Sequence, residues 1–385
     1  PTHKMKLIRS FIQHRNLITK STINPKSINL SIPENVNSLI LLTTPKQLNP
    51  LLKYLSQNNE TFLNSSRLEN LIVASTDTIC HSRNAISELW IENNEIINIK
   101  NIEKTKKIEN KSKLHRQLEP LSVDPIRMSK NWKDIKYDGN ININFINLNK
   151  NIKANLACTL FENNNYNTCF IIKKGLDNEI NGQNLSNIEI EINSNNQISN
   201  INYSNKLIEI PLVEDEDLRD EEYQITSFES NMIKSINDQS ASGYLIDNSI
   251  VTSSKKELFF KLYNKDKEIE KFNEEFYSLV AGGLGWGEKQ AFLVVDPIVG
   301  NVGNRFVKLY YNKIELKMPK IESKDKTTIQ LEVSELEQEF NEVEGKVENE
   351  DTIIINNVFS IGSENGIILN GVNHRAHGEN IEIEI

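Results

Sequence analysis

Two reactive side chains, Cys80 and His81, stand next to each other in a polar segment between two apolar runs. A thiol beside an imidazole is the pairing that cysteine nucleophiles use. Neighbouring residues of an extended strand point to opposite faces, however, so we expect an ordinary buried cysteine here. Loops at strand ends often carry ligand contacts, so the polar side chains of this loop are candidate ligand-binding residues. These are Asp77, His81, Arg83 and Asn84.

A second group, His374, His377 and Glu379, has the composition of a metal site. Histidines three residues apart come together on a helix, whereas Gly371 and Gly378 indicate a turn, and no third and fourth ligand lie nearby. The segment 360–363 lacks the Gly-x-Ser-x-Gly pattern of a nucleophile elbow. We therefore assign no catalytic residue, no metal and no cofactor.

The glycine-rich loop 282–287, Gly-Gly-Leu-Gly-Trp-Gly, is the most distinctive local feature. It matches neither the Walker nor the Rossmann pattern. An apolar stripe predicts a helix over 266–280, so the loop would leave a helix and enter a strand at 291–295. Nucleotide phosphates bind at the opposite, positive end of a helix, which argues against nucleotide binding. Trp286 either lines a ligand pocket or fills a gap in the core.

The segment 100–138 is long, basic and weakly periodic. Its lysines, with Trp132 and Tyr137 further along, could neutralise phosphates and stack bases, which predicts RNA contact. The simpler interpretation is a solvated loop. The candidate RNA-binding residues are Lys104, Lys106, Lys107, Lys111, Lys113 and Arg116.

Charge and composition exclude several classes of protein. The net charge of −9 argues against a general nucleic-acid binder, and three cysteines are too few for a disulfide framework. No apolar run is long enough for a membrane-spanning helix, so we expect a soluble protein. The first 33 residues contain no Asp or Glu and are basic and amphipathic, which is typical of a mitochondrial transit peptide. These features predict a mitochondrial matrix protein.

Strand patterns outnumber helical ones, which predicts an α+β fold of strand-rich sheets flanked by a few helices. Short apolar runs at 39–42 and 71–74 indicate buried strands. A helix is predicted after the first run, starting either at a capping box of Thr44 and Gln47 or at Asn49 as cap with Pro50 in the first turn. Segments 86–91 and 95–100 resemble a hairpin. Further strands are expected at 141–145, 154–161, 169–173, 188–192, 306–311, 352–356, 366–369 and 381–385.

The acidic run 214–222 is expected to connect two domains. The predicted division is a targeting segment over 1–33, an N-terminal α+β domain over 34–213 and a C-terminal α+β domain over 223–385. The basic segment would be an insertion in the N-terminal domain.

The block 279–290, Leu-Val-Ala-Gly-Gly-Leu-Gly-Trp-Gly-Glu-Lys-Gln, followed by a strand that ends at Asp296-Pro297, resembles a segment of fungal FIST-domain-like (F-box and intracellular signal transduction) proteins. Segments 39–42, 82–87 and 155–161 are also similar to that family. The resemblance implies a two-part α+β domain that holds small ligands such as amino acids, without established catalytic residues. The motif positions carried over are Gly283, Gly285, Trp286, Gly287 and Lys289. The chain lacks an F-box segment, which argues against a ubiquitin-ligase adaptor.

We therefore expect a non-catalytic mitochondrial ligand-binding or protein-interaction module, with the motif loop and the Asp77 to Asn84 loop bordering its pocket. Its partner would be a small molecule or a protein. The alternative is a mitochondrial gene-expression factor that contacts RNA or the mitoribosome through the basic segment 104–136. A third hypothesis is an enzyme with a degenerate site.

Overall fold

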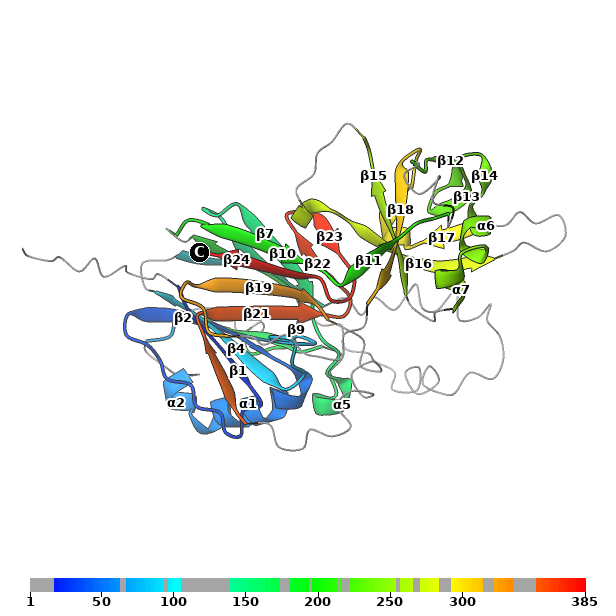
Figure 1. Cartoon of the computed structure of the whole chain (residues 1–385). Helices are drawn as coiled ribbons and strands as arrows, with labels where there is room; N and C mark the ends of the chain where they lie inside the picture. Colours follow the sequence, from blue (N-terminus) through cyan, green and yellow to red (C-terminus); the bar gives the residue numbers. More distant parts are fainter. Residues whose placement is uncertain are drawn as a thin grey trace, which may run out of the picture.

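The computed structural model describes residues 17–62, 67–92, 96–104, 139–165, 167–173, 181–193, 196–213, 215, 222–253, 257–265, 271–283, 292–313, 322–334 and 351–385. Strands predominate over helices among these residues, and the fold is α+β, as the sequence predicts. Four sheets form two groups, and the two groups lie side by side (Figure 1).

The first sheet has the strand order β20-β1-β4-β2-β3-β8. Its central strands are apolar on both faces because both faces are covered. In β2, Ile40 and Leu42 join a central core, whereas Leu39 and Leu41 pack on the opposite side, against helix α1. The bounds are β1 Leu17–Ile23, β2 Val36–Thr43, α1 Pro45–Gln57, α2 Asn59–Phe62, β3 Asn70–Ser75, β4 Ala85–Glu92, β8 Cys169–Lys173 and β20 Ile353–Asn356.

Helix α1 begins after Thr44, the first of the two predicted starts, but the capping box does not form. Thr44 makes no side-chain hydrogen bond to the helix; its hydroxyl accepts from the backbone N–H of Ala85 at 3.0 Å. The Gln47 side chain donates to Asn84 at 2.6 Å. Both capping residues therefore join the helix to the start of β4.

The central core lies between the first sheet and two others. The second sheet has the order β10-β24-β19-β21 and the third the order β23-β22-β7-β6-β9-β5. The bounds are β5 Ile96–Lys104, β6 Asn140–Phe145, β7 Lys150–Asn155, α5 Leu160–Asn163, β9 Leu185–Asn193, β10 Asn200–Ser204, β19 Thr328–Val333, β21 Val358–Ser363, β22 Ile367–Leu369, β23 Val372–His374 and β24 Asn380–Glu384.

Two strand predictions in this group need correction. Strands β4 and β5 do not form a hairpin, because β4 pairs with β1 and β2 whereas β5 pairs with β9 in another sheet. The strand expected over 154–161 ends at Asn155, and Leu160–Asn163 form α5. Local alternation indicates a strand but does not specify its partner.

The fourth sheet, here called the closed sheet, has the order β11-β18-β15-β16-β17-β13-β12, with β14 paired to β13. It curls back on itself, because the backbone N–H of Ile225 donates to Arg305 and that of Val307 donates to Tyr223. Its interior core is capped by α6. The bounds are β11 Leu207–Ile210, β12 Ile225–Glu229, β13 Met232–Ile236, β14 Gln239–Ser240, α6 Ala241–Ile246, α7 Ser249–Ser253, β15 Leu258–Tyr263, η2 Lys271–Asn273, β16 Phe276–Gly283, β17 Phe292–Val295, η3 Pro297–Val299 and β18 Phe306–Asn312.

The helix predicted over 266–280 is wrong for the part that the structure describes. Residues 276–283 form strand β16, preceded by the short helix η2. Phe276 and Tyr277 are both buried, in different cores on the two sides of the closed sheet. Only a strand points adjacent side chains to opposite faces, so tertiary burial decided this segment.

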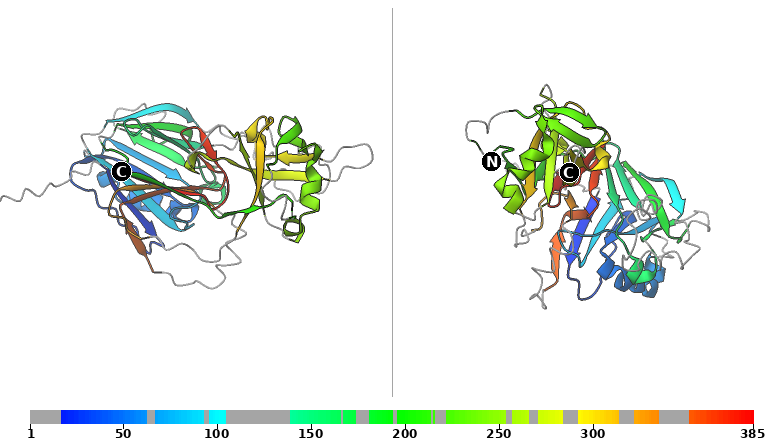
Figure 2. Two further views of the ribbon diagram at one scale, coloured as in Figure 1. Left: turned by 45° about the horizontal axis from the view of Figure 1, so that its top comes forward. Right: turned by 90° about the vertical axis from the view of Figure 1, so that its right-hand side faces the viewer.

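After the closed sheet the chain returns to the first group of sheets. Strand β20 pairs with β1, β22 with β7 and β24 with β10. The predicted division into 34–213 and 223–385 therefore does not describe how the strands pair. The targeting segment predicted over 1–33 also needs correction, because Leu17–Ile23 form β1, an inner strand of the first sheet that pairs with β4 and β20. The views in Figure 2 show the green and yellow closed sheet beside the other three sheets.

Within the described ranges, no helix combines the length and the apolar character needed to cross a membrane.

Candidate functional site

The predicted Cys80–His81 loop is a tight turn. The backbone N–H groups of Ile79 and Ser82 donate to each other's carbonyls at 2.9 and 3.0 Å. Cys80 and His81, between them, have φ angles of 50° and 58°. Two left-handed residues in a two-residue turn are characteristic of type I′, which Asn-Gly usually occupies. Each non-glycine residue costs about 1–2 kcal/mol in this conformation, so other contacts must hold the turn.

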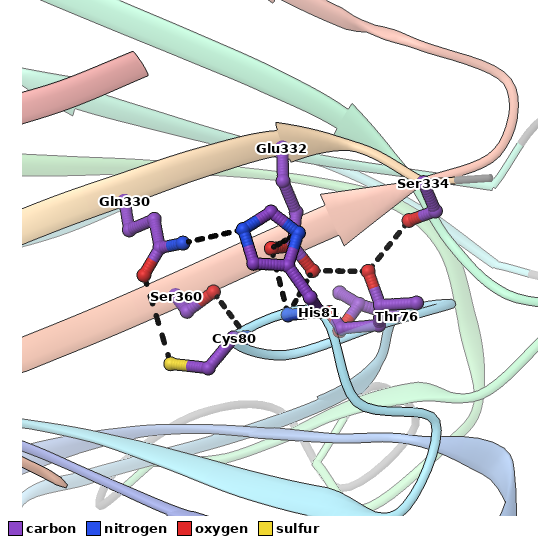
Figure 3. Close-up of polar contacts among 8 residues, drawn as sticks. Thr76, Cys80, His81, Gln330, Glu332, Ser334 and Ser360 are labelled. Carbon is purple, nitrogen blue, oxygen red and sulfur yellow. Dashed lines mark hydrogen bonds and ion pairs between the residues drawn. The ribbon is translucent and has the colours of Figure 1, made fainter. Parts of the chain in front are cut away.

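Those contacts come from the second sheet. The backbone N–H of Cys80 donates to Ser360 Oγ at 2.8 Å, from β21. The backbone N–H of His81 donates to both carboxylate oxygens of Glu332, from β19, at 3.0 and 2.9 Å. The turn is thereby fastened to two parallel strands (Figure 3).

Glu332 is the centre of the cluster, with a side chain that is only 1% exposed. It accepts from His81 Nδ1 at 3.1 Å and from the Thr78 hydroxyl, which also contacts Ser334 at 2.6 Å. A proton on Nδ1 leaves His81 Nε2 as an acceptor, and Gln330 Nε2 lies 3.3 Å from it. A buried carboxylate with this many donors needs no further counter-ion.

The thiol of Cys80 does not face the imidazole. It donates to Gln330 Oε1 at 3.7 Å, so Gln330 separates the sulfur from His81 (Figure 3). Burial, reinforced by the negative charge of Glu332, raises the pKa of Cys80 to about 12. The thiol is therefore protonated at neutral pH, as expected for a buried cysteine and not for a nucleophile.

Asp77 and Arg83 lie at the rim of the same turn. The backbone N–H of Glu364 donates to Asp77 Oδ2 at 2.8 Å, and Arg83 pairs with the Glu364 carboxylate at 2.5 Å. Burial is the main cause that raises the pKa of Asp77 to about 6, and the charge of Glu364 adds to it. Asp77, His81 and Arg83 thus surround the ends of β19 and β21, whereas the Asn84 side chain turns away toward Gln47 and Asn24.

Gly362 permits the close approach of the turn to β21. A Cβ at this position would collide with the Thr78 hydroxyl and lie 2.6 Å from Glu332 Oε1. Thr78 and Gly362 also form a β-bridge. The requirement here is space, because Gly362 is not among the residues with positive φ.

The other predicted site residues do not join this cluster among the described residues. Gly283 ends β16, in register with Phe292. Lys104 ends β5, in register with Leu185. The remaining motif and basic positions lie outside the described residues, so the ligand and RNA hypotheses for them stay predictions. These positions are Gly285, Trp286, Gly287, Lys289, Lys106, Lys107, Lys111, Lys113 and Arg116.

The two C-terminal histidines have different partners. His374 Nδ1 lies 3.4 Å from Glu379, inside the protein, whereas His377 Nδ1 lies 2.9 Å from Glu257. The described part of the chain holds no group of three His, Cys, Asp or Glu side chains that could bind a metal ion.

Sequence reasoning missed the residues that hold the turn: Gln330, Glu332, Ser334, Ser360 and Gly362. One signal was present, because polar residues alternate with Ile329, Leu331 and Val333 along β19. A strand whose polar positions are all buried marks a polar contact inside the fold. Which residues make that contact depends on segments about 250 residues apart.

A second feature, also missed, is the outer face of the closed sheet. Cross-strand pairs of β15 and β18 form three successive rows on it: Phe259 with Tyr310, Lys261 with Lys308, and Tyr263 with Phe306. Like charges opposite each other are unfavourable. Glu274 and Glu209 relieve this, at 2.7 Å from Lys261 and 2.8 Å from Lys308. The face is therefore aromatic at both ends and ion-paired between them.

No protein-family model matches the chain, and neither the curated proteins nor the solved structures include a significant match.

Proposed function

We propose that the chain is a non-catalytic protein-interaction module of the mitochondrial matrix, similar to FIST-domain-like proteins. The observation that carries the interaction role is the aromatic row Tyr263 and Phe306 on the outer face of the closed sheet. The two ring centroids lie 5.8 Å apart, and both residues keep partial exposure. Aromatic side chains surrounded by charged ones are typical of the energetic centre of a protein interface.

The turn at 79–82 supports the non-catalytic part of the proposal. The imidazole, the carboxylate and the thiol are engaged with one another or with Gln330, and the thiol is protonated. The contacts of these groups hold a strained turn in place. This structural role explains why the groups are present without requiring that they catalyse a reaction. The basic, acid-free sequence that precedes β1 supports the mitochondrial assignment, and the glycine–tryptophan block supports the family resemblance.

Site-specific photo-crosslinking tests the interaction role. A photoreactive phenylalanine analogue replaces Tyr263 in the full chain, which is incubated with mitochondrial extract. The control carries the same analogue at Phe161, which is 89% exposed and lies on helix α5, away from the closed sheet. We expect a crosslinked protein at position 263 that excess wild-type chain competes away and that a Y263A/F306A competitor does not. Crosslinks of equal yield at both positions, or none at 263, would refute the proposal.

A further inference from the structure

The outer face of the closed sheet is already occupied at one end by the chain itself. Ala376, which follows β23, is fully buried against Phe259 and Phe276. The flanking residues carry positive or titratable groups: Arg375 Nη1 lies 3.1 Å from Asp296, and His377 Nδ1 lies 2.9 Å from Glu257. A small aliphatic residue packed against aromatic rings, flanked by basic residues that reach carboxylates, is therefore a binding mode that this face supports.

The other end of the face repeats the same chemistry. Tyr263 and Phe306 are an aromatic pair beyond the row of ion pairs, and Tyr263 lies four residues after Phe259 along β15. Carboxylates border them: Glu209 pairs with Lys308, and Glu222 pairs with Lys265. The side chains of Glu209 and Glu222 are about half exposed, 50% and 49%. The Lys265 ammonium lies over the Phe306 ring, 4.9 Å from its centroid.

Lys265 is an exchangeable partner at this end. Ion pairs between half-exposed side chains contribute little stability, so a basic residue of another molecule can replace Lys265 at Glu222 at small cost. The net charge of −9 for the whole chain also attracts basic partners over a distance. Three features thus favour one kind of occupant: the continuity of the face, the ring pair and the bordering carboxylates.

We infer that the aromatic row Tyr263 and Phe306 binds a protein segment in which a small aliphatic residue stands between basic residues, as Ala376 does within this chain. This inference rests on the proposed interaction function and names the chemistry of its partner. The segment would pack its aliphatic side chain against the rings and bring its basic residues to the bordering carboxylates.

A synthetic peptide provides the probe. It has the sequence of residues 372–379, Val-Asn-His-Arg-Ala-His-Gly-Glu, with a fluorescent label, and binding to the full chain is followed by anisotropy at low ionic strength. The matched control peptide carries Glu at the positions of Arg375 and His377. We expect binding to the wild-type chain that weakens at least tenfold with the control peptide and at least tenfold with the Y263A/F306A chain. Because the control peptide leaves the protein unaltered, it keeps the test valid if the double variant misfolds.

Each outcome is decisive. Equal binding of the two peptides, or wild-type affinity in a folded Y263A/F306A chain, would overturn the inference. Binding of a labelled oligouridylate that is lost in Y263A/F306A would also overturn it, because the rings would then stack nucleic-acid bases. If the Tyr263 crosslink described above forms while the peptide does not bind, the interaction function stands and only the partner chemistry is wrong.

Discussion

Replacement of Asp77 by Asn tests how the rim of the turn is built. Asp77 accepts the backbone N–H of Glu364 at 2.8 Å and also contacts the Ser363 side chain, and Asn can satisfy both groups without a charge. The pKa of the wild-type carboxyl is raised from 3.8 to about 6, mainly by burial. The charged form is thus the unfavourable one in the folded protein, so its removal stabilises the fold at neutral pH.

The magnitude follows from linkage. A rise from 3.8 to about 6 corresponds to at most about 3 kcal/mol, since one pKa unit is worth about 1.4 kcal/mol. Asp77 keeps some exposure, so we expect an effect of about 1–3 kcal/mol. Between pH 4 and pH 6 the unfolded carboxyl loses its proton before the folded one does. The protonated Asp77 carboxyl therefore stabilises the wild-type fold below pH 4, and this contribution to the free energy of unfolding is lost as the pH rises to 6.

Urea unfolding of wild type and D77N, followed by circular dichroism at intervals from pH 4 to pH 8, measures this difference. D77N and wild type should be nearly equal in stability at pH 4, and D77N should be the more stable by about 1–3 kcal/mol at pH 7 and above. D247N is the matched control, because Asp247 is exposed. A difference that does not change with pH, or a D77N chain less stable than wild type at pH 7.5, would refute the reasoning.

Three further predictions concern other parts of the fold. G362A should lower the free energy of unfolding by about 1–3 kcal/mol, because its Cβ collides with the turn. G243A is the control and should not lower it, because Gly243 lies in open space on α6. Equal urea midpoints for G362A and wild type would contradict the prediction. Of the three cysteines, only Cys158 should react rapidly with a thiol reagent in the native protein, because Cys80 and Cys169 are buried and burial raises both pKa values to about 12. A second fast-reacting thiol in the folded chain would contradict this prediction. A376D places a charge in the buried cluster with Phe259 and Phe276 and should increase hydrogen exchange over 372–378, whereas R375A removes a partly exposed ion pair and should cost less than about 1 kcal/mol. Unchanged exchange in A376D would show that this contact does not hold the segment.

The sequence predicted individual strands better than their partners. The apolar runs of β2 and β3 are buried on both faces, as continuous apolar strands usually are. Alternation at 188–192 also predicted the inward isoleucines of β9. In contrast, β16 was predicted as a helix, because an apolar stripe at helical spacing did not reveal that both faces of the segment would be buried.

The candidate site shows the same division. The sequence indicated a polar loop with Asp77, His81 and Arg83, because those residue types follow one another between two apolar runs. It did not indicate Glu332, whose contacts with Thr78 and His81 join segments about 250 residues apart. A single sequence records which residues are neighbours along the chain and carries no direct record of pairs this distant.

By itself, the sequence determined the strand-rich α+β class, the buried runs of the first sheet and the net charge, because these depend on residue type and local period. Only the tertiary structure decided that Cys80 and His81 occupy a left-handed turn held by Glu332 and Ser360. It also decided that β19 to β24 return to the first group of sheets and that aromatic rows line the closed sheet. Strand pairing is a choice among many edges of similar local chemistry, and the burial of the whole chain makes that choice.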